Sequence, residues 1–361
     1  MRPLRLGIVG CGGISHRHAS AAAASPEVAI VACCDTRIDA AKSWAAGYGC
    51  EASYPDYRTM IAAHELDGVL LATWPADHRE HILGCLDAGV RTVLCEKSLT
   101  TSGPQALEVY RAAEAAQALV VEAFMYRHHP AFAQLERLVD SGEIGTVDTV
   151  RASFDHYDAE SSAPDDPLRD WRQKVETGGG VPYDLACYCV DACNHFAGAL
   201  PRRTLAIRDR SERYGTINRL YGLIEYTNGA VGIVTSSSKS DFDHALRISG
   251  HRGHVVLPVA WRIEGPIGVT LSRSVGWGLF HEERFPLAAA DPFRLQLDRL
   301  AAVVRGEAES SPTLAESVVN AVTLDALLQS AAERTPFDVD VPEEIVTDRP
   351  GPPDTSLRRS S

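Results

Sequence analysis

The first 125 residues alternate short apolar runs with Ala-rich or amphipathic stretches. The apolar runs predict strands, and the stretches between them have the spacing of helices. Strands that alternate with helices of this length indicate a parallel sheet covered by helices on both faces. The predicted strands are 4–10, 28–35, 67–73, 91–97 and 119–124, and the predicted helices are 15–25, 38–49, 54–66, 78–89 and 103–117.

After this block the pattern changes to longer runs in which apolar and polar residues alternate, as in half-buried strands. Turn sequences such as "YTNGAV" and "SGHRGHVV" predict hairpins between them. The fold class is therefore α/β, with an N-terminal Rossmann parallel sheet and a C-terminal α+β domain that has a large, mostly antiparallel open sheet. We predict a Rossmann domain at 1–125, a substrate-binding and oligomerisation domain at 126–340, and a disordered tail at 341–361, where Pro and Ser are frequent.

Length and composition agree with two domains. The chain has 361 residues, 45% of them apolar and 23% charged. Its net charge of −13 argues against a nucleic-acid partner, because a phosphate-binding face needs clustered Lys and Arg. No apolar run reaches the roughly 18 residues of a membrane span. The N-terminus enters a strand at once, without a signal-peptide pattern, so we expect a cytoplasmic location.

The nine cysteines do not form a disulfide pattern. Cys187, Cys189 and Cys193, together with His195, raise the question of a zinc site. Cys187 and Cys189 are two positions apart on a predicted helix, so they point to different sides and do not chelate one ion together. We predict no metal, and we expect the cysteines to be small buried hydrophobic residues.

A glycine-rich turn follows the first predicted strand and opens the first helix. It reads Gly10-Cys11-Gly12-Gly13-Ile14-Ser15, and the next strand ends in an acidic residue, as in dinucleotide-binding folds. In such a turn the first glycine makes the bend, and the second lets the backbone approach a pyrophosphate at the helix N-terminus. The alternative is a glycine turn without a ligand.

Asp35 ends the second strand, about 20 residues beyond the turn, where a carboxylate accepts the ribose hydroxyls of an adenosine. A 2′-phosphate at that place would be repelled, so NAD is expected rather than NADP. Arg37, two residues later, offers a cation that weakens this preference.

Ligands of a doubly wound sheet bind beyond the carboxyl ends of its strands. Thr73 lies at one such end, and Glu96 and Lys97 lie at another, in the sequence "LCEKSL". We therefore expect Lys97 to face the nicotinamide side of the crevice. The alternative is that Glu96 and Lys97 are solvated residues at a strand end.

A second group of candidates follows three glycines in "ETGGGVPYDLACYCVD". Asp184 and Tyr188 are four residues apart, so they share a face near the start of a predicted helix, and Asp191 lies close to that face. An acid and a phenol in this position suit a polyhydroxylated substrate, and a phenol near an ammonium exchanges protons at a lowered pKa. The alternative is a core tyrosine and an aspartate that caps the helix.

These motifs together resemble the glucose–fructose oxidoreductase/inositol dehydrogenase (Gfo/Idh/MocA) family over nearly the whole chain to about residue 340. The matching segments are "GIVGCGGIS", "YPDYRTMI", "ATWPADHREHI", "AGVRTVLCEKSL", "EAFMYRHHPAF", "LVDSGEIGTV", "GGGVPYDLACYCVD" and "RLQLDRLAAVVRG". The resemblance implies an NAD(P)-dependent hydride transfer at a sugar or cyclitol carbinol and an open sheet that faces a second subunit. The family lysine falls on Lys97 and its paired aspartate on Asp184.

The resemblance also implies roles for residues that the pattern alone does not single out. Tyr188 stands where many members have His, which is similar to the dihydrodiol, aldose and keto-sugar reductase branches. Ser98 replaces the family's proline after Lys97, and Trp74-Pro75 replaces its usual Pro-Asn. The remaining candidates are His78, Trp171 and Arg172 at the cofactor, and Arg127 and His129 at the substrate. For the last two, a helix-capping surface position is the alternative.

The predicted function is an NAD-linked oxidoreductase of a sugar, cyclitol or related polyol, assembled as a homodimer or homotetramer. Lys97, Tyr188 and Asp184 are the expected catalytic residues. Lys97 orients the substrate oxygen, Tyr188 exchanges its proton, and Asp184 holds a neighbouring hydroxyl. Two alternatives stay open, namely elimination across a glycosidic bond with transient use of the cofactor, and a cofactor-binding sensor without catalysis.

Overall fold

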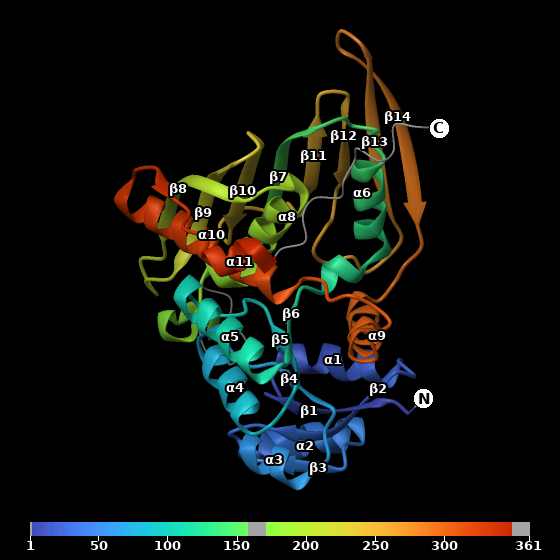
Figure 1. Cartoon of the computed structure of the whole chain (residues 1–361), viewed down its shortest axis with the longest axis vertical. Helices are drawn as coiled ribbons and strands as arrows, with labels where there is room; N and C mark the ends of the chain where they lie inside the picture. The colour runs from blue at the N-terminus through green and yellow to red at the C-terminus, as the bar shows by residue number, and fades with distance from the viewer. Residues whose placement is uncertain (1, 158–170, 349–361) are drawn as a thin grey trace.

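The computed structural model describes residues 2–157 and 171–348. Figure 1 shows two layered parts, with the N-terminal sheet at the bottom and a larger sheet at the top. The six strands of the first sheet run parallel in the order β3-β2-β1-β4-β5-β6. They are β1 (Leu4–Val9), β2 (Val28–Cys34), β3 (Ala52–Tyr54), β4 (Gly68–Leu71), β5 (Thr92–Glu96) and β6 (Leu119–Ala123).

Every residue of β4 and β5 is buried, as expected for central strands of a parallel sheet covered on both faces. The predicted Rossmann sheet is confirmed, and β3 is a strand that the sequence pattern did not predict. The helices of this part are α1 (Gly13–Ala23), α2 (Ile38–Tyr48), α3 (Tyr57–Ala63), α4 (Pro75–Asp87) and α5 (Gly103–Ala116).

The second sheet has nine strands in the order β14-β13-β12-β11-β7-β10-β9-β8-β15. Only the β7–β10 pair among them is parallel, so the predicted, mostly antiparallel sheet is confirmed. The strands are β7 (Val147–Asp155), β8 (Pro201–Arg210), β9 (Ile217–Tyr226), β10 (Val231–Ser237), β11 (Leu246–Gly250), β12 (Gly253–Leu257), β13 (Ile267–Gly276), β14 (Leu279–Leu287) and β15 (Phe337–Asp338).

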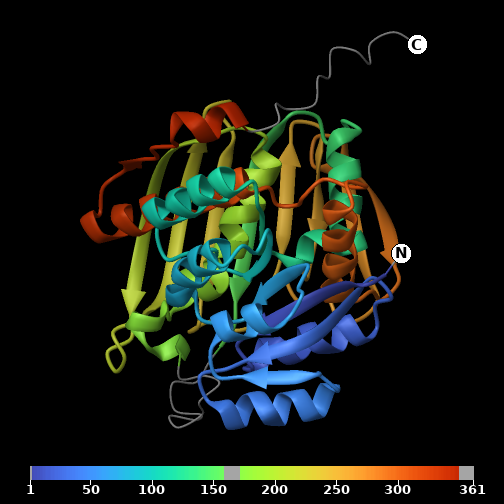
Figure 2. The ribbon, with the colours of Figure 1, turned by 60° about the horizontal axis from the view of Figure 1, so that its bottom comes forward.

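Helices cover one face of this sheet, as the turned view in Figure 2 also shows. The short helical turn η1 precedes α6, and the turns η2, η3 and η4 precede α8. These elements are η1 (Met125–His128), α6 (Pro130–Asp140), η2 (Trp171–Gln173), η3 (Val175–Thr177), η4 (Pro182–Ala186), α8 (Cys187–Ala197), α9 (Pro292–Val304), α10 (Leu314–Glu333) and α11 (Glu343–Asp348).

Two C-terminal helices return to the N-terminal half. α9 packs against α1, where Phe293 makes an edge contact with the His18 ring and Asp298 accepts a hydrogen bond from Ser25. α10 packs against α5. The first sheet is thus covered in part by residues from beyond position 290.

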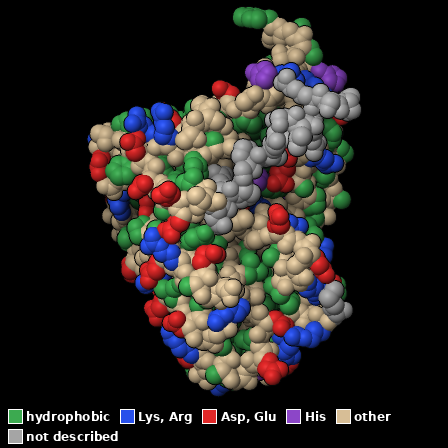
Figure 3. Space-filling view, in the orientation of Figure 1, with side chains coloured by type: hydrophobic (Ala, Val, Ile, Leu, Met, Phe, Trp, Pro, Cys, Tyr) green, Lys and Arg blue, Asp and Glu red, His purple; other side chains and the backbone are tan. Residues whose placement is uncertain are grey.

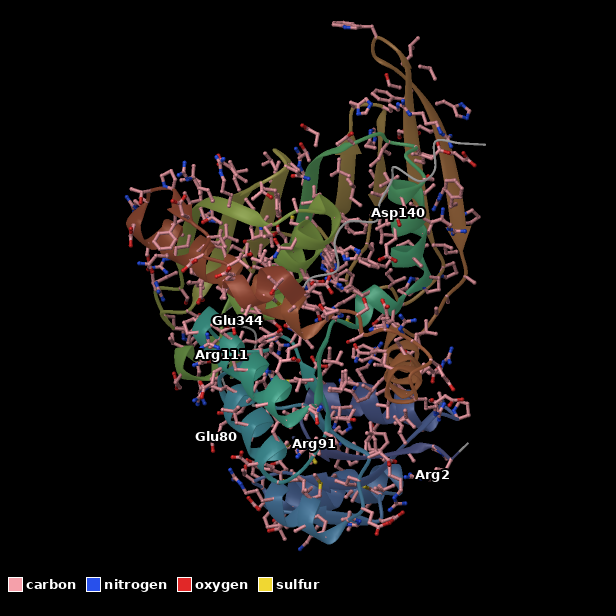
Figure 4. The ribbon with its side chains drawn as sticks, viewed as in Figure 1. Arg2, Glu80, Arg91, Arg111, Asp140 and Glu344 are labelled. Carbon is pink, nitrogen blue, oxygen red and sulfur yellow. The ribbon has the colours of Figure 1, made fainter. Side chains whose placement is uncertain are left out.

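The prediction of disorder from residue 341 is wrong for 341–348. This segment forms α11, and its Ile345 side chain is fully buried. Glu344 of α11 forms an ion pair with Arg111 of α5, and Figure 4 shows the two side by side. The sequence analysis missed this helix because only one buried apolar residue and one ion pair anchor it, and these form no recognisable periodicity in a Pro-rich segment. Residues 349–361 lie outside the described residues.

The other face of the nine-stranded sheet carries exposed apolar residues, among them Leu205, Ile207 and Leu223. The β13–β14 hairpin, which the sequence analysis did not predict, projects beyond the sheet with Trp277 at its turn. Figure 3 shows hydrophobic side chains at this tip. In the described part of the chain, no helix combines the length and the apolar character that crossing a membrane requires.

A buried ion pair joins three of the helical elements. Arg127 of η1 binds Asp191 of α8 through two hydrogen bonds, of 2.8 Å from Nε and 2.6 Å from Nη2. Its third nitrogen lies 3.2 Å from Glu316 of α10. Asp191 also accepts hydrogen bonds from Tyr126 and Asn320. Since all the guanidinium nitrogens are bound within the core, Arg127 holds these helices together and does not face a substrate.

Replacing Arg127 with Gln leaves the Asp191 carboxylate buried without a cation. We expect the variant to lose about 3–5 kcal/mol of unfolding free energy, the usual cost of breaking a buried ion pair. Urea denaturation of the purified protein measures it. The control is Arg2→Gln, which removes an exposed arginine that binds Asp67 in the same two-pronged manner. Equal unfolding midpoints for the two variants would contradict the structural role of Arg127.

Candidate active site

The predicted glycine turn lies between β1 and α1 and has the shape that a dinucleotide needs. Gly10 has φ +92°, and a Cβ there would lie 2.6 Å from the Ala72 carbonyl oxygen, so only glycine fits. A Cβ on Gly12 would have no atom within 4 Å, which leaves open space at the N-terminus of α1. Gly13 and Ile14 begin that helix. The chain at this turn therefore fits a pyrophosphate bound by helix N–H groups.

Asp35 follows β2 and faces the same turn. Its carboxylate accepts hydrogen bonds from the backbone N–H of Cys11 at 3.0 Å and of Arg37 at 2.9 Å. Each oxygen keeps a free lone pair for a ribose hydroxyl. The Arg37 guanidinium lies 3.7 Å from Asp35, and its side chain is 71% exposed. The structure thus places beside the turn both the carboxylate that suits NAD and an exposed cation that suits a phosphate.

Two predicted cofactor residues, His78 of α4 and Glu96 at the end of β5, bind other groups of the protein. The His78 ring is fully buried, with its nitrogens 3.1 Å from the Thr73 carbonyl oxygen and 2.7 Å from that of Ser98. Glu96 is also buried and lies 2.6 Å from a ring nitrogen of His18, a residue of α1 that the sequence reasoning missed. His78 therefore fixes the backbone at Thr73 and Ser98, and Glu96 fixes the His18 side chain of α1.

Lys97 and Asp184 meet between the two sheets. The Lys97 ammonium donates to the Asp184 carboxylate at 2.8 Å and to its backbone carbonyl at 2.6 Å. The second carboxylate oxygen accepts a hydrogen bond from Arg172 of η2 at 2.6 Å. Burial alone raises the pKa of Asp184, but the two cations outweigh it and hold this pKa below its usual value. Asp184 is thus a fixed anion between two cations, and Lys97 is not a freely solvated strand end.

Tyr188 is close to this pair but is deeply packed. The Lys97 ammonium lies 5.2 Å from the centre of its ring, and its hydroxyl points to the sulfur of Met125 at 3.6 Å. The expected lowering of its pKa is wrong, because burial, aided by the Glu96 carboxylate, raises the pKa of Tyr188 well above its usual value. The ammonium lies over the ring rather than beside the oxygen, which sequence spacing does not reveal.

The glycines before Asp184 form a close-packed turn. Gly180 has φ +98°, and a Cβ there would lie 2.7 Å from the Ile217 carbonyl oxygen. The Gly179 and Gly180 N–H groups donate to carbonyls of η2 and its neighbour Lys174. The next turn, η4, is a π-helix, so the simple four-residue spacing from Asp184 to Tyr188 does not describe it. This turn brings Asp184 to Lys97 and Arg172.

The two remaining predicted residues, His129 and Trp171, have different surroundings. His129 is buried and caps α6, accepting a hydrogen bond from the Ala131 N–H at 3.0 Å, so the capping alternative holds, although not at the surface. Trp171 lies in η2 beneath the Arg172 guanidinium, 4.6 Å from it.

The three cysteines of α8 have free, buried thiols, and His195 binds Glu136. No group of three potential metal ligands occurs within 2–157 and 171–348.

A cleft of about 230 Å³ opens beside Asp184. It lies at the end of the second sheet where β7 and β10 finish and β9 begins, so His156 and Ser238 line it side by side. Asn218 and Arg262, which the sequence reasoning missed, also line it. Neither belongs to a motif, and only the fold brings them to Asp184.

A buried carboxyl, Glu122 of β6, lies behind the Lys97 segment. It accepts a hydrogen bond from the backbone N–H of Leu99 at 2.8 Å. With Ser98 and Tyr183 it lines an internal cavity of about 20 Å³, enough for one water molecule. Burial raises the pKa of Glu122 to about 8, so the group stays protonated at neutral pH. Glu122 thus supports the strand end that carries Lys97.

The parallel sheet, its glycine turn and the Lys97–Asp184 pair define a two-domain oxidoreductase that binds a nicotinamide dinucleotide. Comparison with known families agrees. Residues 4–124 match the oxidoreductase family model for an NAD-binding Rossmann fold, and residues 136–339 match the model for its C-terminal α/β domain. The chain belongs to the Gfo/Idh/MocA oxidoreductase family, so the predicted resemblance is confirmed.

Individual relatives cover most of the chain. A D-xylose 1-dehydrogenase (NADP⁺) of Haloferax volcanii is 27% identical over 93% of this chain and 100% of that protein. A trans-1,2-dihydrobenzene-1,2-diol dehydrogenase of Mus musculus is 27% identical over 70% of this chain and 74% of its own. Among solved structures, a 3-ketoreductase of Actinomadura kijaniata with bound NADP and TDP-benzene has a TM-score of 0.81 at 26% identity, covering 91% of this chain and 98% of its own.

A levoglucosan dehydrogenase in complex with NADH and L-sorbose has a TM-score of 0.83 at 22% identity, covering 94% of this chain and 100% of that chain. At this identity the likeness concerns the fold. These relatives include both NADP and NADH binders. The comparisons therefore support NAD(P) binding without deciding between the two cofactors.

Glu122 gives a pH prediction. Its pKa is higher in the folded protein than in the unfolded chain, so unfolding releases a proton between about pH 4.5 and 8. Folding stability contributed by this group falls as pH rises through that window. Glu122→Gln keeps an acceptor for Leu99 but has no proton to lose. We expect its stability relative to wild type to increase with pH, on the order of 1 kcal/mol per pH unit, and to level off above pH 8.

Chemical denaturation at pH 5, 7 and 9 measures this difference. Glu114→Gln on the exposed side of α5 is the control, and its stability relative to wild type should show no such trend. A constant difference between Glu122→Gln and wild type at all three pH values would show that Glu122 is already ionised in the folded protein.

Proposed function

We propose that the protein is an NAD(P)-dependent dehydrogenase or reductase that acts on a carbinol or keto carbon of a sugar, cyclitol or related polyol. The observation that carries the proposal is the Lys97–Asp184 pair, which lies between the dinucleotide-binding sheet and the cleft of the second sheet. Relatives named as a xylose dehydrogenase, a dihydrodiol dehydrogenase and a 3-ketoreductase support this substrate class.

The cofactor, when bound, supplies the hydride acceptor for oxidation or the hydride donor for reduction. Gly10, Gly12 and the α1 N-terminus would hold its pyrophosphate, and Asp35 would hold its ribose hydroxyls. In this proposal the Lys97 ammonium binds the substrate oxygen that gains or loses a proton. Asp184 holds that ammonium in position, because its carboxylate and its backbone carbonyl both accept hydrogen bonds from the Lys97 nitrogen.

Tyr188 is proposed as the proton donor for reduction. Its raised pKa keeps the phenol protonated, so it has a proton to give, and it is a poor base for the reverse step. Lys97 is the second candidate for this proton, since its ammonium lies 5.2 Å from the centre of the Tyr188 ring. Structures of the related 3-ketoreductase include variants with a replaced lysine or a replaced tyrosine.

Two further statements complete the proposal. The favoured cofactor is NAD, because Asp35 accepts hydroxyls and repels a phosphate. The assembly is a homo-oligomer in which the open face of the nine-stranded sheet meets a second subunit, and the exposed Leu205, Ile207 and Leu223 on that face support this arrangement.

The test of function is a panel of sugars and polyols with NAD or NADP, followed by nicotinamide absorbance. Lys97→Ala and Tyr188→Phe are compared on each active substrate. We expect both to bind cofactor nearly as wild type does and to lose about 10²–10⁴-fold in kcat, as removal of a positioned proton-transfer group does.

If only Lys97→Ala loses activity, the Lys97 ammonium alone transfers the proton, and the proposed role of Tyr188 as proton donor is wrong. Cleavage of a glycoside without net NADH would favour the elimination alternative. Cofactor binding without turnover of any panel member would favour the sensor.

Cofactor choice has its own test. Asp35→Ser removes the carboxylate that opposes a 2′-phosphate, while Arg37 stays in place. We expect wild type to bind NAD more tightly than NADP and the variant to lose or reverse that difference. Titration of both proteins with both cofactors measures it, and wild-type protein that binds NADP as tightly as NAD would contradict the preference.

A further inference from the structure

The cleft beside Asp184 carries more positive charge than the rest of the chain suggests. Among its lining residues are Arg172 and Arg262, and Asp184 is their acidic counterpart. The Asp184 carboxylate is already bound by Lys97 and Arg172, one on each oxygen. Arg262 therefore adds a cation that this acid does not neutralise, in a chain whose net charge is −13.

Arg262 is held in place by its neighbours in the sequence. Trp261 is 1% exposed, and its indole N–H donates to the Ser153 carbonyl at 2.7 Å. Ile263 is buried as well. These two side chains fix the backbone, and the Arg262 side chain between them is exposed and lines the cleft. Within the described part of the chain, the Arg262 guanidinium has no hydrogen-bond or ion-pair partner.

A second observation also points to a ligand. Asn218 lines the same cleft and is 7% exposed, and its buried side-chain oxygen has no hydrogen-bond partner in the described residues. A buried amide oxygen without a donor costs free energy unless a ligand or water satisfies it. The cleft thus combines an acceptor suited to a hydroxyl with an arginine fork suited to an anion.

We infer that the cleft recognises a sugar or polyol that carries an anionic group, a carboxylate or a phosphate, which Arg262 binds while Asn218 accepts a hydroxyl. This inference rests on the proposed function for the reaction, but the binding it describes is measurable without turnover. A planar guanidinium pairs with both kinds of anion through two parallel hydrogen bonds. The inference makes Arg262 a determinant of specificity.

The experiment uses the full chain saturated with NADH and two matched sets of probes. Each set contains a neutral hexose, its uronate and its 6-phosphate, with D-glucose and D-galactose as the parent sugars. Calorimetric titration gives the dissociation constants. We expect at least one charged form to bind tenfold or more tightly than its neutral parent, and this advantage to shrink at high salt.

The variants separate Arg262 from the general charge of the protein. Arg262→Gln should weaken binding of the charged probe by about 10–100-fold and leave the neutral sugar unchanged. Arg262→Lys should restore part of the loss, since it keeps the charge without the fork. Arg252→Gln is the control. It removes an exposed arginine from the β11–β12 turn, which pairs with the start of β7 and so lies at the opposite end of the sheet.

Neutral sugars that bind as tightly as their charged forms would overturn the inference. So would an anion preference that survives in Arg262→Gln, or a failure of every probe to bind. A preference for the uronate alone identifies a carboxylate as the anion, and a preference for the 6-phosphate alone identifies a phosphate. Tight anion binding without any hydride transfer would leave this inference standing and remove the proposed function.

Discussion

The ion pair between Lys97 and Asp184 depends on both halves of the chain. Lys97 directly follows a strand of the parallel sheet, and Asp184 lies on a π-turn at the head of α8. Neither half alone gives the ammonium a buried counter-ion. Desolvating two charges is costly, so the pair is favourable only while the two sheets keep their spacing and Arg172 shares the carboxylate. The site is therefore a property of the interface between the halves.

Local patterns in the sequence were sufficient to predict both sheets and the cofactor-binding turn. Continuous apolar runs predicted the first sheet, and runs in which apolar and polar residues alternate predicted the second. The turn from Gly10 to Ser15 was recognisable because the backbone conformation there requires glycine. Asp35 followed from its distance to that turn. Family resemblance, rather than spacing, paired Lys97 with Asp184. Such features depend on a few consecutive residues or on one motif.

Other features depend on contacts between distant segments, and the sequence does not display them. Arg127 looks like a substrate residue in "MYRHHP", but Asp191, sixty-four positions later, binds it in the core. Burial raises the pKa of Tyr188, whose ring packs among those of Phe124, Phe154 and Trp261 at 5.4–5.8 Å. Arg262 and Asn218 carry no motif at all. Burial and long-range pairing decide the role of each of these residues.

The return of α9 onto α1 has a consequence for how the molecule can be divided. Arg305, just after α9, binds Glu27, and Phe293 covers His18, which in turn binds Glu96. A fragment cut after residue 125 would keep every strand of the parallel sheet, yet it would expose the α1 surface and leave the His18–Glu96 pair open to water. The nucleotide-binding half thus has a complete sheet but depends on the C-terminal half for its packing. The helix that covers α1 is translated only after residue 290.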